Sequence, residues 1–484
     1  MIEKSLCIHG HFYQPPREDP FSGVVPDEVG SAPYRNWNEK ITAECYRPNA
    51  EKGNFGKISF NFGPTLFRWL EKNDPLTYGR IIEQERANYQ INGVGNGMAQ
   101  AYNHSILPLA SYKDKLTQIR WGIADFEYRF KHKPEGMWLP ETAVDLETLN
   151  ILSDCGIQFT ILAPWQVNAP ELDTSSSYLI KLPGGRKPLK ILLYNEGLST
   201  AISFRPTSTI DGDAFLTSIN QSKDSLVLLA SDGELYGHHQ PFRDIFLEYI
   251  LNEGARRHNI SLAYPSLILK ETDTKNYVSL NEFTSWSCHH GVRRWSEECD
   301  CTPGAKWKSP MRVSMDTLGE ELNYVYESYV AGLVKNPWQL RDNFIEVIQG
   351  KLTVDELLDI NLLGIITKEE KMNIGSLLQA QYERQKIFTS CGWFFQEFHR
   401  IEPQNNISYV AKAIWLTKKA TKIDLTEIAL KLLSKVKSEK TGLRGDTVFS
   451  QTWIRLCDED NLDNSITSNF QAEWQPGTLN SPQP

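Results

Sequence analysis

Two segments of the sequence place a carboxylate directly after an apolar stretch. Glu141 follows the Trp-Leu-Pro tripeptide at 138–140, and Asp232 follows the apolar stretch 226–230. Proline cannot extend a sheet ladder, so Glu141 is predicted to lie where a buried strand ends. Cleavage of a glycosidic bond needs two flanking carboxyl groups, one as acid/base and the other as nucleophile or base. Together, the two segments suit this chemistry.

Each carboxylate also has a purely structural interpretation. Glu141 is followed by two good helix-start residues, so it could cap a helix, and the Asp-Gly pair at 232–233 is typical of a turn. The second segment also carries Glu234, a tyrosine and a histidine pair at 238–239. So many polar groups directly after a buried strand favour a functional cluster.

Three further segments carry polar or aromatic side chains. The alternate histidines of segment 9–17 could ligate a metal, orient sugar hydroxyls or simply be satisfied polar residues. The glycine-rich segment 93–98 lacks the spacing of a dinucleotide fingerprint and is interpreted as a tight loop after a strand. Segment 284–295 holds two tryptophans and two histidines, and Cys288, Cys299 and Cys301 lie in or just after it. Because the paired C-x-x-C spacing of zinc sites is absent, a sugar groove is favoured over a structural metal.

These segments need elements that bring them together. Short apolar runs alternate with helical stretches over the first ~280 residues, a rhythm typical of a parallel α/β sheet or barrel. In such a barrel the carboxyl ends of the strands converge on one face, where residues distant in sequence meet. We predict strands near 6–9, 58–61, 89–92, 137–139, 159–162, 191–194 and 226–230.

The pattern changes after about residue 310, where apolar residues recur at helical spacing in the stretch 318–333. We therefore predict a catalytic β/α barrel over 1–305, a helical C-terminal domain over 306–440 and an irregular tail over 441–484. The fold class is α/β, followed by an α-helical domain.

Composition restricts the partners. The formal charge is −9 with no basic block, so neither nucleic acid nor an acidic membrane surface is an expected partner. No apolar run reaches the ~20 residues of a membrane span, and the first residues lack the apolar core of a signal peptide, so we expect a cytoplasmic protein with reduced cysteines.

Thirteen tryptophans and nineteen tyrosines include more aromatic rings than a core needs, and an aromatic face matches the apolar face of a pyranose.

The segments, in this order, resemble glycoside hydrolase family 57. The Glu141 and Asp232 segments are the specific ones, the resemblance spans roughly residues 5–300, and the helical part resembles an uncharacterised C-terminal module found in a subset of that family. One departure is Tyr13, which stands where the family often has a second histidine and puts the substrate in doubt more than the reaction. The matching segments are His11 to Pro15, Asn103 to Pro108, Trp138 to Glu141, Asp232 to His238, and Ser285-Trp286.

The resemblance implies an incomplete, seven-stranded β/α barrel and a retaining mechanism on α-glucans, and the expected partner is an oligo- or polysaccharide substrate, an α-1,4-glucan. It makes Glu141 the nucleophile and Asp232 the general acid/base, which calls for a low pKa at Glu141 and a raised one at Asp232. No metal or organic cofactor is expected for catalysis, and amylase, branching and 4-α-glucanotransferase activities are all compatible. Substrate binding is assigned to His9, His11, Gln14, His104, Trp138, Glu234, His238, Trp286, His289 and Trp393.

Two other functions stay open at this point. One is a metal-dependent polysaccharide deacetylase or mannosidase-like hydrolase that holds zinc with His9, His11 and either Asp232 or His238. The other is a non-catalytic glucan-binding protein. The aromatic run that begins at Trp393 further predicts that the helical domain closes over the site and that this ring reaches the substrate, against the alternative of a buried helix face.

Overall fold

The computed structural model describes residues 4–463, which form two compact units. The barrel unit comprises residues 4–19 and 24–294, and the helical unit comprises residues 20–23 and 295–463. The boundary near 294 lies eleven residues before the predicted one at 305. No helix in the described part of the chain is long and apolar enough to cross a membrane.

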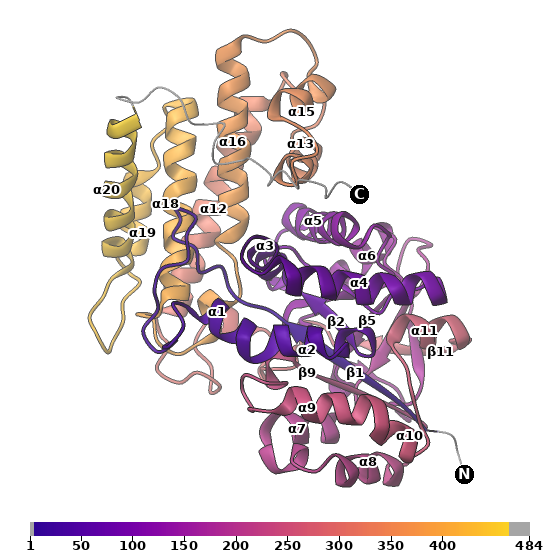
Figure 1. Cartoon of the computed structure of the whole chain (residues 1–484). Coiled ribbons are helices and arrows are strands. Elements are labelled where there is room, and N and C mark those ends of the chain that lie inside the picture. The colour runs from indigo at the N-terminus through magenta and orange to yellow at the C-terminus, as the bar shows by residue number, and fades with distance from the viewer. Residues whose placement is uncertain (1–3, 464–484) are drawn as a thin grey trace, which may run out of the picture. The chain divides into compact units, whose positions relative to one another are not determined.

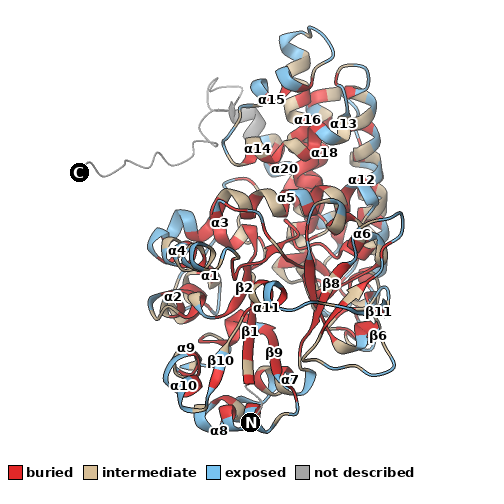
Figure 2. Ribbon diagram, turned by 90° about the vertical axis from the view of Figure 1, so that its right-hand side faces the viewer, coloured by how far each residue is buried: buried red, intermediate tan, exposed pale blue. Residues whose placement is uncertain are grey.

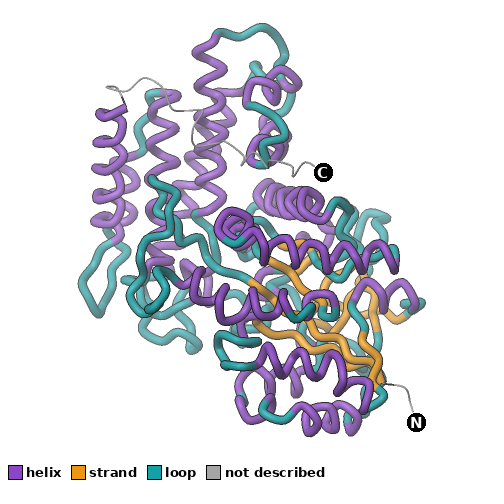
Figure 3. The backbone as a smooth tube through the Cα atoms, viewed as in Figure 1, coloured by secondary structure: helices purple, strands orange, loops and turns teal. Residues whose placement is uncertain are grey.

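Parallel strands form the centre of the barrel unit (Figures 1 and 3). Strand β1 pairs in parallel with β2, β9 and β10, β3 pairs with β4, and β5 pairs with β8. The strands of this unit are β1 (Lys4–Phe12), β2 (Ser59–Phe62), β3 (Ala99–Gln100), β4 (Met137–Trp138), β5 (Phe159–Leu162), β6 (Val167–Asn168), β7 (Ser177–Ile180), β8 (Leu189–Leu193), β9 (Leu226–Asp232), β10 (Ile260–Leu262) and β11 (Asn276–Leu280).

Isolated contacts connect these ladders. Parallel bridges join Phe60 to Gly97 and Gly136 to Phe159, and the amide of Asn195 donates to the carbonyl of Leu228 at 2.7 Å. The described residues therefore form a barrel-like arrangement of three sheets, of four, five and two strands. The predicted β/α barrel is confirmed at this level, and its count of seven strands stays a prediction.

Helices cover the strands on their outer side (Figure 1). Several begin at side-chain caps: Ser111 accepts from the amide of Asp114 at the start of α5, and Asp145 accepts from Thr148 at the start of α6. The helices of this unit are α1 (Trp37–Ile41), α2 (Arg47–Glu51), α3 (Pro64–Asn73), α4 (Pro75–Asn92), α5 (Tyr112–Phe130), α6 (Leu146–Asp154), α7 (Glu196–Phe204), α8 (Gly212–Gln221), α9 (Arg243–Tyr249), α10 (Ala255–Arg257) and α11 (Pro265–Glu271).

The strand predicted at 89–92 is wrong, because these residues form the last turn of α4. The helix starts at an Asp74 cap with proline at its first position and runs unbroken to Gly93, whose left-handed backbone (φ 67°) ends it. The glycine-rich loop therefore follows a helix rather than a strand. The other six predicted strands overlap β1, β2, β4, β5, β8 and β9.

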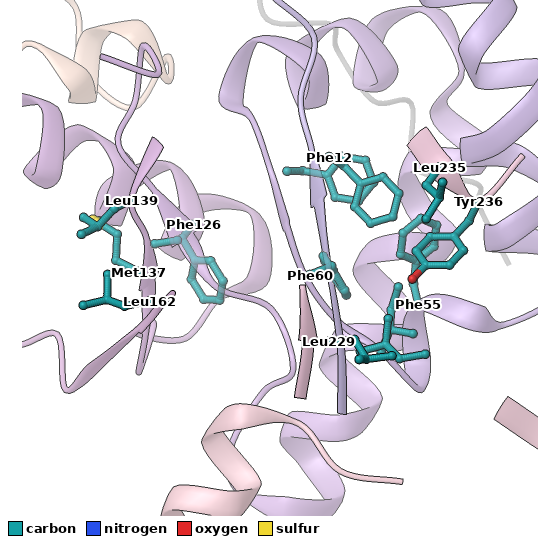
Figure 4. Close-up of a cluster of buried hydrophobic side chains, with 14 of the residues drawn as sticks. Phe12, Phe55, Phe60, Phe126, Met137, Leu139, Leu162, Leu229, Leu235 and Tyr236 are labelled. Carbon is teal, nitrogen blue, oxygen red and sulfur yellow. The ribbon is translucent and has the colours of Figure 1, made fainter. Parts of the chain in front are cut away.

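The core lies between the strands and these helices, and β1, β2, β5, β8 and β9 are buried along almost their whole length, as Figure 2 shows for β1, β8 and β9. Phe12, Phe55 and Phe60 pack ring against ring beside β1, with centroids 5.1 and 5.4 Å apart (Figure 4). Because both faces of these strands are covered, they read as continuous apolar runs, which is why the sequence located them.

Long helices packed side by side form the helical unit. Segment 20–23 belongs to this unit: Lys412 of α18 donates to the carbonyl of Pro20 at 2.8 Å, and the Arg455 guanidinium of α20 lies 4.0 Å from the Phe21 ring. The helices are α12 (Lys308–Val330), α13 (Pro337–Asn343), α14 (Ile345–Ile348), α15 (Val354–Asn361), α16 (Lys368–Lys386), α17 (Cys391–Phe394), α18 (Ile401–Thr421), α19 (Thr426–Leu433) and α20 (Gly445–Asp463).

The irregular tail predicted over 441–484 is wrong for its first half, which forms α20. Residues such as Val448 and Phe449 are buried, and this packing stabilises a segment whose polar composition suggested an irregular chain. Residues 464–484 lie outside the described residues.

Candidate active site

Glu141 lies in a tight turn directly after β4. Its backbone and that of Thr142 have positive φ values of 59° and 50°, in the left-handed region that non-glycine residues rarely occupy. The turn is held from behind, because the Thr142 hydroxyl donates to Gln166 Oε1 and Gln166 Nε2 donates to the Thr142 carbonyl, both at 2.8 Å. Backbone strain of this kind persists only where surrounding contacts enforce it, and it is concentrated at functional sites.

Two donors converge on one oxygen of the Glu141 carboxylate. Trp286 Nε1 donates to Oε2 at 3.0 Å, and the Ser287 hydroxyl donates to the same oxygen at 2.6 Å. The Trp286 amide also donates to the Glu141 carbonyl at 3.0 Å. Side chain and backbone of Glu141 are therefore both fixed by segment 286–287.

Burial raises the pKa of Glu141, although the bonds from Ser287 and Trp286 and the charge of Arg294 oppose the rise. The low pKa predicted for this residue is therefore wrong in direction. The physical reason is that desolvation of the carboxylate outweighs the three favourable contacts.

Asp232 ends β9 and is the register partner of His11 on β1. Its side chain is accessible to water, yet the surrounding protein and the repulsion from Glu141 raise its pKa to about 7. The predicted rise is confirmed in direction. With a pKa of about 7, Asp232 can hold a proton near neutral pH, as a general acid requires.

His11, the register partner of Asp232, and Trp286, a donor to Glu141, belong to one group of contacting aromatic rings. His11 Nε2 is 3.1 Å from His104 Nε2, the His104 ring stacks on Tyr13 at 3.8 Å, and Trp286 meets His11 edge-on at 6.4 Å. Burial lowers the pKa of His11 to about 4, and the pKa of His104 falls well below its usual range for the same reason. Both imidazoles are thus neutral near pH 7, with one donor and one acceptor each.

His9 and Trp138 lie next to this group of rings. Both are fully buried, and their rings stack with centroids 4.6 Å apart. His9 bonds Ser59 Oγ at 2.9 Å and Asn61 Oδ1 at 3.1 Å, and burial lowers its pKa to about 3. Neither side chain has a surface exposed to a sugar in this structure, so the substrate contact predicted for both stays untested.

Glu234, two residues after Asp232, is also buried. Its Oε1 accepts from the Tyr46 hydroxyl at 2.6 Å and from the Tyr13 amide at 3.1 Å. Burial raises the pKa of Glu234 to about 8, with a further contribution from Asp232. Gln14, which follows Tyr13 in the chain, is buried as well. The substrate contact predicted for these two residues stays a prediction.

His238 is half-buried, and its Nδ1 is 2.6 Å from Glu44 Oε2. Glu44 and Tyr46 both come from the short π-helix Thr42–Tyr46, a form of backbone found often at functional sites. Neither residue was identified from sequence, because no spacing in this stretch distinguishes a π-helix from an α-helix. Ser287 lies within the predicted segment 284–295, but the sequence predicted no role for this residue.

Two other predicted substrate contacts are His289, for which contact stays a prediction, and Trp393. His289 is exposed in the loop after Ser287. Trp393 belongs to α17 of the helical unit and is 1% exposed, so its ring presents no free face to a sugar. Its assignment to substrate binding is a correction: the aromatic run is a buried helix face, which was the plainer alternative.

The proposed zinc-dependent alternative fails on geometry. Among residues 4–463, His9, His11, Asp232 and His238 form no group of three ligand atoms close enough to share an ion. Both ring nitrogens of His9 are engaged by Ser59 and Asn61.

These observations define a β/α-barrel protein with two carboxyl groups at the carboxyl ends of its strands. The fold is shared with the solved exo-type maltose-forming amylase from Pyrococcus sp. ST04, with a TM-score of 0.71 at 16% identity over 93% of this chain and 88% of that one. Residues 21–281 match glycosyl hydrolase family 57, and the chain belongs to this family.

The chain is also similar in sequence to two named proteins. Alpha-amylase 1 of Dictyoglomus thermophilum is 30% identical over 37% of this chain, and the 4-alpha-glucanotransferase of Thermococcus litoralis is 24% identical over 37%. The matches span 26% and 27% of those relatives, about a quarter of their length. Residues 304–456 match a domain of unknown function, DUF3536, which confirms the uncharacterised module expected there.

Proposed function

We propose that this protein is a retaining glycoside hydrolase or transglycosylase that acts on α-1,4-glucans. Membership of family 57 and the named relatives support a glucan-active enzyme. The arrangement that carries the assignment of roles is Glu141, held by hydrogen bonds from Trp286 and Ser287, near Asp232, whose pKa is raised to about 7 by burial and by the charge of Glu141.

In the first step, Asp232 gives its proton to the glycosidic oxygen while Glu141 Oε1 or Oε2 attacks the anomeric carbon. The carbon–oxygen bond to the leaving sugar breaks, and a glycosyl ester forms on Glu141. In the second step, Asp232 takes the proton of water or of an acceptor hydroxyl, whose oxygen attacks the same carbon and releases Glu141. Two inversions at one centre retain the α configuration.

The surrounding residues support this sequence of steps. Trp286 and Ser287 orient the carboxylate of Glu141 and favour its ionised form, so that it is ready to attack. His11 Nδ1 is already bonded to Asn61 and its Nε2 to His104 Nε2, so a sugar hydroxyl that binds these neutral imidazoles would displace one of these partners.

The test compares the wild type with Glu141→Gln and Asp232→Asn on maltoheptaose and amylose, with Glu271→Gln as a control at an exposed carboxylate of the same unit. Products are separated by chromatography, and their anomeric configuration is followed by NMR. We expect α products first, loss of about 10²–10⁴-fold in Asp232→Asn, and unchanged activity in the control.

A substrate with a good leaving group separates the two roles. With α-glucosyl fluoride, departure of the leaving group needs little acid assistance, so Asp232→Asn should regain its first step while Glu141→Gln stays inactive. Longer products identify transfer to sugar, and shorter products alone identify hydrolysis. β products appearing first, or a fully active Glu141→Gln, would contradict the proposal.

A further inference from the structure

Four potential metal ligands converge in the loop that follows the Glu141 clamp. The sulfur atoms of Cys288, Cys299 and Cys301 and a ring nitrogen of His290 all lie within 4.8 Å of one another. All four belong to one continuous stretch of fourteen residues, with the pattern C-x-H-x₈-C-x-C. The cluster is therefore a local feature of this loop.

We propose that these four residues bind a structural zinc ion. Three thiolates and one imidazole are an established donor set for zinc, which prefers four ligands in a closed tetrahedron. With zinc–ligand bonds of about 2.0–2.3 Å, neighbouring ligand atoms in a tetrahedron lie about 3.4–3.8 Å apart. Binding of zinc therefore requires the largest separation, at most 4.8 Å, to contract by about 1 Å.

Burial also suits a closed structural site. Cys288 and Cys299 are buried, and His290 and Cys301 are half-buried. The set of donors leaves no position for water, so the ion would stabilise the loop rather than take part in the reaction. Calcium and magnesium prefer oxygen ligands, and this cluster offers none.

The spacing of these ligands differs from the usual zinc pattern. Cysteine ligands commonly occur as C-x-x-C, whereas here the two residues of each pair, Cys288/His290 and Cys299/Cys301, are separated by a single residue. His290 had been assigned to a sugar groove with its neighbour, and the structure instead turns it towards the three cysteines.

The position of the loop relates the ion to the proposed reaction. Ser287, which donates to Glu141, immediately precedes Cys288, and Arg294, whose charge favours ionised Glu141, lies between His290 and Cys299. Zinc would therefore fix the segment that positions the nucleophile. This consequence rests on the proposed function, but the metal site itself does not.

The first test is the metal content of the full-length, tag-free protein, purified with a reductant from cells supplied with zinc. We expect about one zinc per chain by mass spectrometry of the elements. Cys299→Ser and Cys301→Ser should retain at least about tenfold less zinc after dialysis, since each lacks one ligand. Cys155→Ser, at a half-buried cysteine of α6's C-terminal end, is the matched control and should keep the full content.

A second measurement needs no variant. Cobalt(II) added to the metal-free wild type should give the intense visible bands of tetrahedral thiolate coordination, and zinc should abolish them. Wild-type protein without metal, equal zinc in Cys299→Ser and Cys155→Ser, iron in place of zinc, or a mass two hydrogens lower, which marks a disulfide, would each overturn the proposal. None of these outcomes bears on the activity towards glucan.

Discussion

The hydrogen bond from Ser287 to Glu141 gives the sharpest prediction. Replacing Ser287 by alanine removes the shorter of the two donors to Oε2, at 2.6 Å, and leaves the one from Trp286 at 3.0 Å. The lost bond stabilises the ionised carboxylate and has little effect on the protonated form. Ser287→Ala should therefore raise the pKa of Glu141 further above its usual range.

The magnitude follows from the strength of such bonds. A hydrogen bond to a charged group contributes about 1.5–3 kcal/mol, which corresponds to about 10- to 150-fold in the ionised fraction. This loss applies at pH values where Glu141 is mostly protonated. At higher pH, where the carboxylate is ionised in both proteins, the difference should shrink to the smaller effect of poorer orientation.

The assay is the pH dependence of kcat/KM for maltoheptaose between about pH 4 and 8, which reports ionisation in the free enzyme. Ser287→Ala should shift the acidic limb to higher pH, while Ser287→Thr, which keeps a hydroxyl, should restore it. If alanine lowers kcat/KM by the same factor at every pH, the electrostatic reasoning is refuted and Ser287 only orients the carboxylate.

Three further predictions concern charge. Because Asp232 must carry a proton and its pKa is about 7, activity should fall as pH rises through about 7; an unchanged basic limb in an active Asp232→Glu variant would count against this assignment. Glu234 has its pKa raised from 4.5 to about 8, so its favourable contribution is complete below 4.5 and is lost as pH rises to about 8. Glu234→Gln should then gain stability over the wild type by about 1.4 kcal/mol per pH unit in that window, measured by urea unfolding; a constant difference contradicts it. Arg129, 4% exposed and bonded to Asp125 at 2.9 Å, should lose about 3–5 kcal/mol as Arg129→Met, against within about 0.5 kcal/mol for the 66% exposed Arg35→Met; equal losses would show that burial of the pair is unimportant.

A structural zinc ion changes how a chelator experiment is interpreted. Chelator sensitivity would ordinarily indicate a metal-dependent hydrolase. Here, removal of zinc would loosen the loop that carries Ser287 and so slow the reaction of the carboxylate pair. Zinc removal should then shift the acidic limb in the same direction as Ser287→Ala, whereas a catalytic metal would leave no activity at any pH.

The sequence located the features that depend on local pattern. Buried parallel strands appear as uninterrupted apolar runs, so the ends that present Glu141 and Asp232 could be predicted, together with their partner His11. The failure at 89–92 has the same origin, because a short run of mixed residues does not reveal whether it continues a helix begun fourteen residues earlier.

Features that depend on three-dimensional contact were beyond the sequence. Whether an aromatic residue faces a sugar or a core depends on the elements packed over it, which is why Trp393 was misassigned. The pKa of Glu141 likewise depends on the balance of burial and hydrogen bonds, and residue types alone do not determine that balance.

Segment 20–23, which packs with α18 and α20, bears on synthesis of the chain. The ribosome releases Phe21 early, whereas its contact Arg455 emerges about 430 residues later. At about 5–20 residues per second, the segment waits roughly 20–90 s for its partner. The nascent barrel therefore carries segment 20–23 without its contacts to α18 and α20 while the rest of the protein is made, and a chain truncated at residue 294 would never form those contacts.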